Sequence, residues 1–135
     1  MLYQEYDFLD RFAAAAESGF RGVEYHFPYD FSANEISEHL QRLGLKQVLH
    51  NLPAGDWAGG ERGIACLPDR QGEFQEGVGK AIEYANTLGC TQLNCLVGIQ
   101  PVDNLGYEGW MGCEYVPATT TVDGLGWARS YLNES

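Results

Sequence analysis

Near its C-terminus the chain reads Gly109-Trp110-Met111-Gly112-Cys113-Glu114-Tyr115-Val116-Pro117. Apolar and aromatic residues, small glycines that allow close packing and a proline that ends the ladder together predict a short buried strand. Glu114 lies where this strand ends. Ligands bind at the carboxyl ends of the strands in α/β sheets, so Glu114 is a candidate to hold a metal or to transfer a proton. The alternative is a carboxylate that simply faces solvent at a strand end.

The rest of the chain repeats the order helix, glycine, strand. The glycines that end the expected helices are Gly19, Gly44, Gly89 and Gly106. Strands that alternate with helices of this length predict βαβ units and a parallel sheet. We expect about four strands, near residues 20–25, 46–50, 92–97 and 109–115. A (β/α) barrel and an open doubly wound sheet both fit this order.

The expected helices have local start signals. Asp7 is placed to cap the first helix, and Ser32-Ala33-Asn34-Glu35 is a capping box that predicts the start of the second. A third helix is expected from about residue 73 to 88, and a last one from near Thr121. The apolar face predicted for the third helix contains Phe74, Val78, Ala81, Ile82 and Ala85.

Two segments depart from the regular order. Residues 51–71 form a long glycine-rich loop, and a loop of this length in a compact domain is typically functional, often a lid. The helix-ending Gly106 follows the end of the strand near Val97 by only nine positions (106 − 97). A parallel crossover with its helix needs at least about 10–12 residues. The spacing therefore indicates a barrel from which pieces are missing.

Composition narrows the classes of partner. The 135 residues carry 19 acidic and 8 basic side chains, a net charge of −11, which argues against binding to nucleic acid or to anionic membranes. No apolar run approaches the ~20 residues of a membrane span, and the N-terminus lacks a signal peptide pattern, so we expect a cytoplasmic protein. The four cysteines form no C-x-x-C pair; buried free thiols are expected, with a zinc site or disulfides as the alternative.

Several stretches carry a family resemblance. They are Gly19-Phe20-Arg21-Gly22-Val23-Glu24, Leu49-His50-Asn51-Leu52-Pro53-Ala54-Gly55-Asp56-Trp57, Gly60-Glu61-Arg62-Gly63-Ile64-Ala65-Cys66, Asn94-Cys95-Leu96-Val97-Gly98 and Gly112-Cys113-Glu114-Tyr115. With these residues the chain resembles the hydroxypyruvate isomerases of the xylose-isomerase-like TIM-barrel superfamily. The resemblance implies an α/β fold that is a partial (β/α)8 TIM barrel within one domain, 1–135. Residues 1–101 resemble the family's N-terminal half without its first strand, and residues 102–135 resemble its last βα unit.

The resemblance also implies a reaction and a site. The reaction is the isomerisation of hydroxypyruvate to tartronate semialdehyde through an enediolate, assisted by a divalent cation, Mg²⁺ or Mn²⁺, and without a redox cofactor. Glu114 matches a catalytic glutamate of the family that is also a metal ligand. No residue matches the second catalytic glutamate or the other metal ligands, so the 135-residue chain is expected to be inactive.

Other residues are weaker candidates. His50 lies at a strand end and could contact the sugar-acid substrate, or it could be hydrogen-bonded beneath the long loop. Arg62 could pair with the substrate carboxylate, whereas Glu24 is expected to be structural. A 2-oxo-tetronate isomerase and a non-catalytic remnant of the family remain alternatives. Since missing strands would leave apolar edges, self-association is also expected.

Overall fold

A computed structural model describes residues 2–100 of the 135-residue chain. The chain divides into two units, Met1–Pro101 and Val102–Ser135, and all the described residues lie in the first. The strand predicted at 109–115 and the last helix therefore lie outside the described residues. The predicted division of a single domain into residues 1–101 and 102–135 also depends on those residues, and it stays a prediction.

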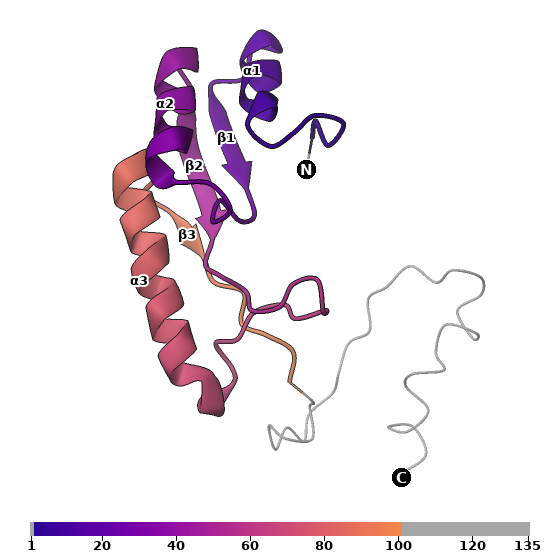
Figure 1. Cartoon of the computed structure of the whole chain (residues 1–135), viewed down its shortest axis with the longest axis vertical. Helices are drawn as coiled ribbons and strands as arrows, with labels where there is room; N and C mark the ends of the chain where they lie inside the picture. Colours follow the sequence, from indigo (N-terminus) through magenta and orange to yellow (C-terminus); the bar gives the residue numbers. More distant parts are fainter. Residues whose placement is uncertain (1, 101–135) are drawn as a thin grey trace, which may run out of the picture. The chain divides into compact units, whose positions relative to one another are not determined.

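The first unit alternates helices and strands (Figure 1). Their order is α1 (Asp10–Glu17), β1 (Gly22–Tyr25), α2 (Ala33–Leu43), β2 (Lys46–Asn51), the short 3-10 helix η1 (Pro68–Arg70), α3 (Gln71–Leu88) and β3 (Leu93–Asn94). The three strands form one sheet in the order β1-β2-β3, and both pairs are parallel. The predicted βαβ arrangement is thus confirmed for this part of the chain.

The hydrophobic core lies between the sheet and the helices. Its buried residues come from all three helices, from β1 and from the segments next to β2 and β3: Phe12, Tyr25, Ile36, Leu40, Leu45, Tyr84, Ala85, Leu88 and Cys90. Figure 1 shows α2 and α3 side by side along the sheet. The cavity of the candidate site borders this core, because Phe12 and Tyr25 belong to both.

Helix boundaries follow the local signals, with one correction. The Ser32 side chain accepts a hydrogen bond from the Glu35 amide at 3.2 Å, which confirms the capping box. Gly44 and Gly89 end α2 and α3 in the left-handed conformation, at φ of 63° each. The prediction for Asp7 was wrong: Leu9 is at the N-cap of α1. Asp7 contributes its main-chain carbonyl instead, which accepts hydrogen bonds from the amides of Asp10 and Arg11, three and four residues further on.

Two further predictions need correction. Ile82 was expected on the buried face of α3, but it is 47% exposed. The buried residues of α3 are Ala81, Tyr84, Ala85 and Leu88, spaced by three and four positions along one face. Ile82 follows Ala81 directly and therefore points about 100° away from that buried face. The third strand was expected over 92–97 but is only Leu93–Asn94, because Val97 forms an antiparallel bridge with Gly63 of the long loop.

Candidate functional site at the carboxyl ends of the strands

The carboxyl ends of the three strands are hydrogen-bonded to one another. His26 follows β1, Asn51 ends β2, and Asn94 ends β3. The Asn51 amide donates to the His26 carbonyl at 2.9 Å, and the Asn94 side-chain amide donates to Asn51 Oδ1 at 3.0 Å. Parallel pairing brings these polar groups to one edge of the sheet, which is the edge where α/β proteins bind their ligands.

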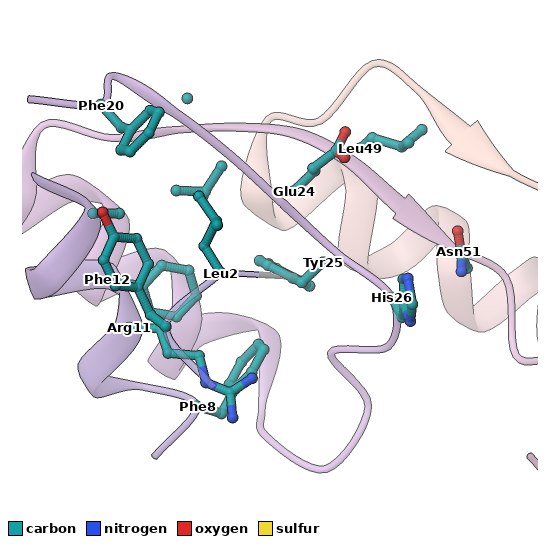
Figure 2. Close-up of a pocket in the computed structure, with 14 residues that line it drawn as sticks. Leu2, Phe8, Arg11, Phe12, Phe20, Glu24, Tyr25, His26, Leu49 and Asn51 are labelled. Carbon is teal, nitrogen blue, oxygen red and sulfur yellow. The ribbon is translucent and has the colours of Figure 1, made fainter. Parts of the chain in front are cut away.

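A cavity of about 390 Å³ lies beside β1 and α1 (Figure 2). Its polar lining residues include Arg11 of α1 and Glu24, His26 and Asn51 from the strands and their ends. Its other lining residues are mostly apolar, among them Leu2, Phe8, Phe12 and Phe20. Glu24, which was expected to be structural, is exposed, and neither ion pair among residues 2–100 involves its carboxylate.

His50 lies on the other face of the sheet. Its side chain is fully buried, and neither ring nitrogen has a hydrogen-bond partner among the described residues. The ring packs edge-on against Tyr29, with 6.2 Å between the ring centroids. Burial lowers the pKa of His50, and the nearby backbone of Ala81 opposes this shift only in part. His50 therefore does not line the cavity, and its proposed contact with substrate stays a prediction.

Tyr29 connects this buried layer with the strand ends. Its hydroxyl donates to the Asn51 carbonyl at 2.6 Å. Burial, and then the nearby Tyr84, raise the pKa of Tyr29, which keeps the phenol protonated and able to donate at neutral pH. The Tyr29 hydroxyl therefore holds the strand end at Asn51 by a hydrogen bond that persists across the physiological pH range.

The side chain of Arg62, on the long loop after β2, stacks on the ring of Trp57. Its guanidinium carbon lies 4.1 Å from the centroid of the Trp57 ring, and Nη1 donates to the carbonyls of Trp57 at 3.2 Å and Glu61 at 2.7 Å. Trp57 in turn packs against His26 and Phe27, with centroid distances of 6.0 and 5.1 Å. His26 also lines the cavity, so Trp57 and His26 connect the Arg62 guanidinium with the cavity.

Sequence reasoning missed the most telling residues of this region, His26, Asn51 and Trp57. The signal was available, since His26 and Asn51 occupy strand ends by the same rule that singled out His50. Successive side chains of a strand point to opposite faces, so His50 and its neighbour Asn51 cannot both face the cavity. A register shift between Val23 and Glu24 further obscures which residues share a face.

The described residues do not supply a metal site. Among residues 2–100, no group of three or more His, Cys, Asp or Glu side chains could hold a metal ion. A divalent cation such as Mg²⁺ requires several oxygen ligands, so these residues do not fit the cation expected from the family resemblance. Glu114, the predicted catalytic residue and metal ligand, lies outside the described residues and stays a prediction.

The described cysteines are free thiols. Cys90 is buried, Cys66 is half-buried, and Cys95 is exposed. Within residues 2–100, no helix is long and apolar enough to cross a membrane.

Fold and site together define part of a β/α barrel with a ligand-binding edge at the carboxyl ends of its parallel strands. The xylose isomerase-like TIM barrel family matches residues 12–103. The chain belongs to this family.

Relatives of known name agree with this assignment. The chain is 58% identical over 101 residues to the hydroxypyruvate isomerase of Escherichia coli, a match that covers 75% of the chain and 39% of that enzyme. It is 48% identical over 103 residues to a 2-oxo-tetronate isomerase of Cupriavidus necator, covering 76% of the chain and 40% of that protein. The chain thus spans about two fifths of the length of the curated relatives it matches.

A solved structure shows the same fold. The crystal structure of a protein titled AP endonuclease, family 2, from Brucella melitensis aligns with a TM-score of 0.70 and 49% sequence identity. The alignment covers 72% of this chain and 38% of that one. The α/β barrel fold predicted from the sequence is therefore confirmed as a partial barrel.

Proposed function

We propose that this chain is the part of a sugar-acid isomerase of the hydroxypyruvate isomerase type that binds the substrate's carboxylate. The observation that carries the proposal is the 58% identity to the Escherichia coli hydroxypyruvate isomerase over 101 residues. The geometry agrees with it, because the exposed guanidinium of Arg62 lies over Trp57, and Trp57 packs against His26, which lines the cavity.

Arg62 is the proposed carboxylate-binding residue. A planar guanidinium matches a carboxylate with two parallel hydrogen bonds, and stacking on Trp57 leaves its remaining N–H groups free to make them. In a chain with a net charge of −11, a positive group at the site also counteracts repulsion of an anionic substrate.

The proton transfer itself is assigned outside the described residues. Glu114 remains the proposed catalytic carboxylate and metal ligand, with Mg²⁺ or Mn²⁺ as the expected cation and no redox cofactor. The 135 residues on their own are proposed to show no turnover, and the cytoplasm is the proposed location. An abasic-site endonuclease activity is less supported, because the acidic balance of the chain disfavours binding to DNA.

A chimera tests this function. The first unit, Met1–Pro101, would replace the matching segment of the Escherichia coli hydroxypyruvate isomerase. We expect the chimera to convert hydroxypyruvate and the isolated chain not to. If the chimera folds and turns over neither hydroxypyruvate nor a 2-oxo-tetronate, the proposal is wrong. Preference for the 2-oxo-tetronate would assign the chain to the second class of relatives.

The role of Arg62 is tested in the same chimera. Arg62→Gln should lower kcat/KM for hydroxypyruvate about ten-fold, mostly through KM, because it removes a charged hydrogen-bonding partner present throughout the reaction. Arg21→Gln is the matched control, since it makes the same change of charge at an exposed position before β1. Equal kinetics for the two variants would remove Arg62 from substrate binding.

A further inference from the structure

The loop that carries Arg62 is a tightly hydrogen-bonded turn. The Glu61 amide donates to the Asp56 carbonyl at 2.9 Å, the Gly59 amide to Asp56 Oδ1 at 2.8 Å, and the Gly63 amide to the Ala54 carbonyl at 3.0 Å. Ile64, just beyond the turn, is only 3% exposed and anchors it to the rest of the unit. Hydrogen bonds within the turn therefore define its conformation, in contrast to an open, extended loop.

One side chain links this turn to α3. Glu61 accepts a hydrogen bond from the Asp56 amide through Oε2, and its Oε1 pairs with Nη1 of Arg70. Arg70 stands immediately before α3 and also binds Glu73 of its first turn, at 2.7 and 2.6 Å. Both members of the Glu61–Arg70 pair are partly shielded, with side chains 31% and 27% exposed, so water screens the pair less than a free surface pair.

The glycines of the turn fit around this carboxylate. Gly55 has φ of 79°, and a Cβ there would come within 2.0 Å of Glu61 Oε2. At Gly63, with φ of 110°, a Cβ would come within 1.8 Å of the Leu96 carbonyl. The space beside Gly55 is thus occupied by the Glu61 carboxylate itself, and the close approach at Gly63 joins the turn to the segment after β3.

We propose that Glu61, held by Arg70, is a positioning residue that fixes the 55–63 turn in its ligand-ready form, so that Arg62 is in place before substrate arrives. The loop then acts as a rigid arm and not as the lid that its length suggested. This inference rests on the proposed function of Arg62, but the rigidity of the turn can be measured without substrate.

Hydrogen–deuterium exchange of the full chain, read by mass spectrometry, tests the rigidity. In the wild type, amides of the 55–63 turn should exchange at least ten-fold more slowly than in an unstructured peptide of the same sequence. Glu61→Ala should remove most of this protection, and Arg70→Gln, which keeps the carboxylate but frees it from α3, should remove part of it. Glu76→Ala is the matched control, because it deletes an exposed carboxylate elsewhere on α3.

A second readout separates positioning from general stability. Calorimetric titration with hydroxypyruvate should show five- to ten-fold weaker binding for Glu61→Ala than for Glu76→Ala, at equal urea midpoints for unfolding. Glu61→Gln, which keeps an acceptor for the Asp56 amide, should restore part of the affinity. Equal affinity of Glu61→Ala and the control would contradict the positioning role.

The exchange results decide the inference on their own. Wild-type exchange in the 55–63 turn as fast as in the free peptide would overturn it, as would equal protection in Glu61→Ala and Glu76→Ala. If the wild type is protected as expected but binds no hydroxypyruvate, the proposed role of Arg62 fails while the rigid turn stands.

Discussion

Two buried polar side chains at neighbouring positions, His50 and Asn51, have different roles in this unit. Asn51 accepts from Asn94 at the edge of the cavity, whereas His50, one residue earlier, is sealed beneath the helices. A buried imidazole without a hydrogen-bond partner is stable only in its neutral form, since charging it would place an uncompensated cation in the core. His50 therefore makes the stability of the unit depend on pH.

The sign of this dependence follows from the lowered pKa of His50. In the unfolded chain the imidazole regains an ordinary pKa of about 6.5 and takes up a proton below that pH, whereas the folded chain excludes it. Stability should thus fall as the pH drops below about 6.5, by up to about 1.4 kcal/mol per pH unit for this one group. Urea unfolding of wild type and His50→Leu between pH 7.5 and 5.5 measures the difference.

The variant should show a shallower loss of stability on acidification than the wild type. His26→Gln, which removes a histidine at an exposed position, serves as the control for the loss of an imidazole. Parallel curves for all three proteins would mean that His50 does not oppose protonation in the folded state.

At the scale of the elements, glycines have opposite effects at different positions. Gly44 ends α2 at φ of 63°, in a region that L side chains adopt at a cost of about 1–2 kcal/mol, although a Cβ there would meet no atom within 4 Å. Gly79 lies inside α3 with equally open space and an ordinary helical backbone. At both positions the backbone conformation therefore decides how an added methyl group changes the free energy of unfolding. The change is expected to be a decrease at Gly44 and an increase at Gly79.

Gly44→Ala should lower the free energy of unfolding by about 1 kcal/mol, and Gly79→Ala should raise it by about 0.5–1 kcal/mol. The measurement is urea unfolding followed by circular dichroism at a fixed protein concentration. Each variant is the control for the other, because both add the same methyl group. Changes of the same sign would contradict the conformational explanation.

For the whole molecule, the edges of the sheet matter most. Among residues 2–100, β1 has a strand neighbour on one side only, and β3 contains two residues. Large apolar side chains are exposed nearby, including Leu2, Phe20, Val97 and Ile99. Unpaired strand edges with apolar surroundings are templates for association with other chains.

We therefore expect the 135-residue chain to self-associate at micromolar concentrations, as sedimentation velocity over a concentration series would show. Ile99→Lys should reduce the association, because it places a charge on an apolar side chain that is 67% exposed. Gln75→Lys adds the same charge at an exposed polar position of α3 and should change little. A concentration-independent monomer would contradict the expectation.

The sequence by itself determined the local features of this protein. The capping box at Ser32, the left-handed glycines after α2 and α3 and the alternation of helices with parallel strands follow from interactions within a few residues, so the pattern was sufficient. The family was also recognisable, because the stretch from His50 to Cys66 is specific to it. The position of Arg62 on the long loop after β2 was part of that pattern.

Only the tertiary structure decided which side chains face the cavity. His50 and Asn51 are equivalent strand-end residues in the sequence, and the register of β1 against β2 places one in the core and the other at the site. The shortening of β3 likewise depends on the bridge between Gly63 and Val97, which are 34 positions apart (97 − 63). Contacts between segments so distant in the chain leave no local signal, because their free energy exists only once the chain has folded.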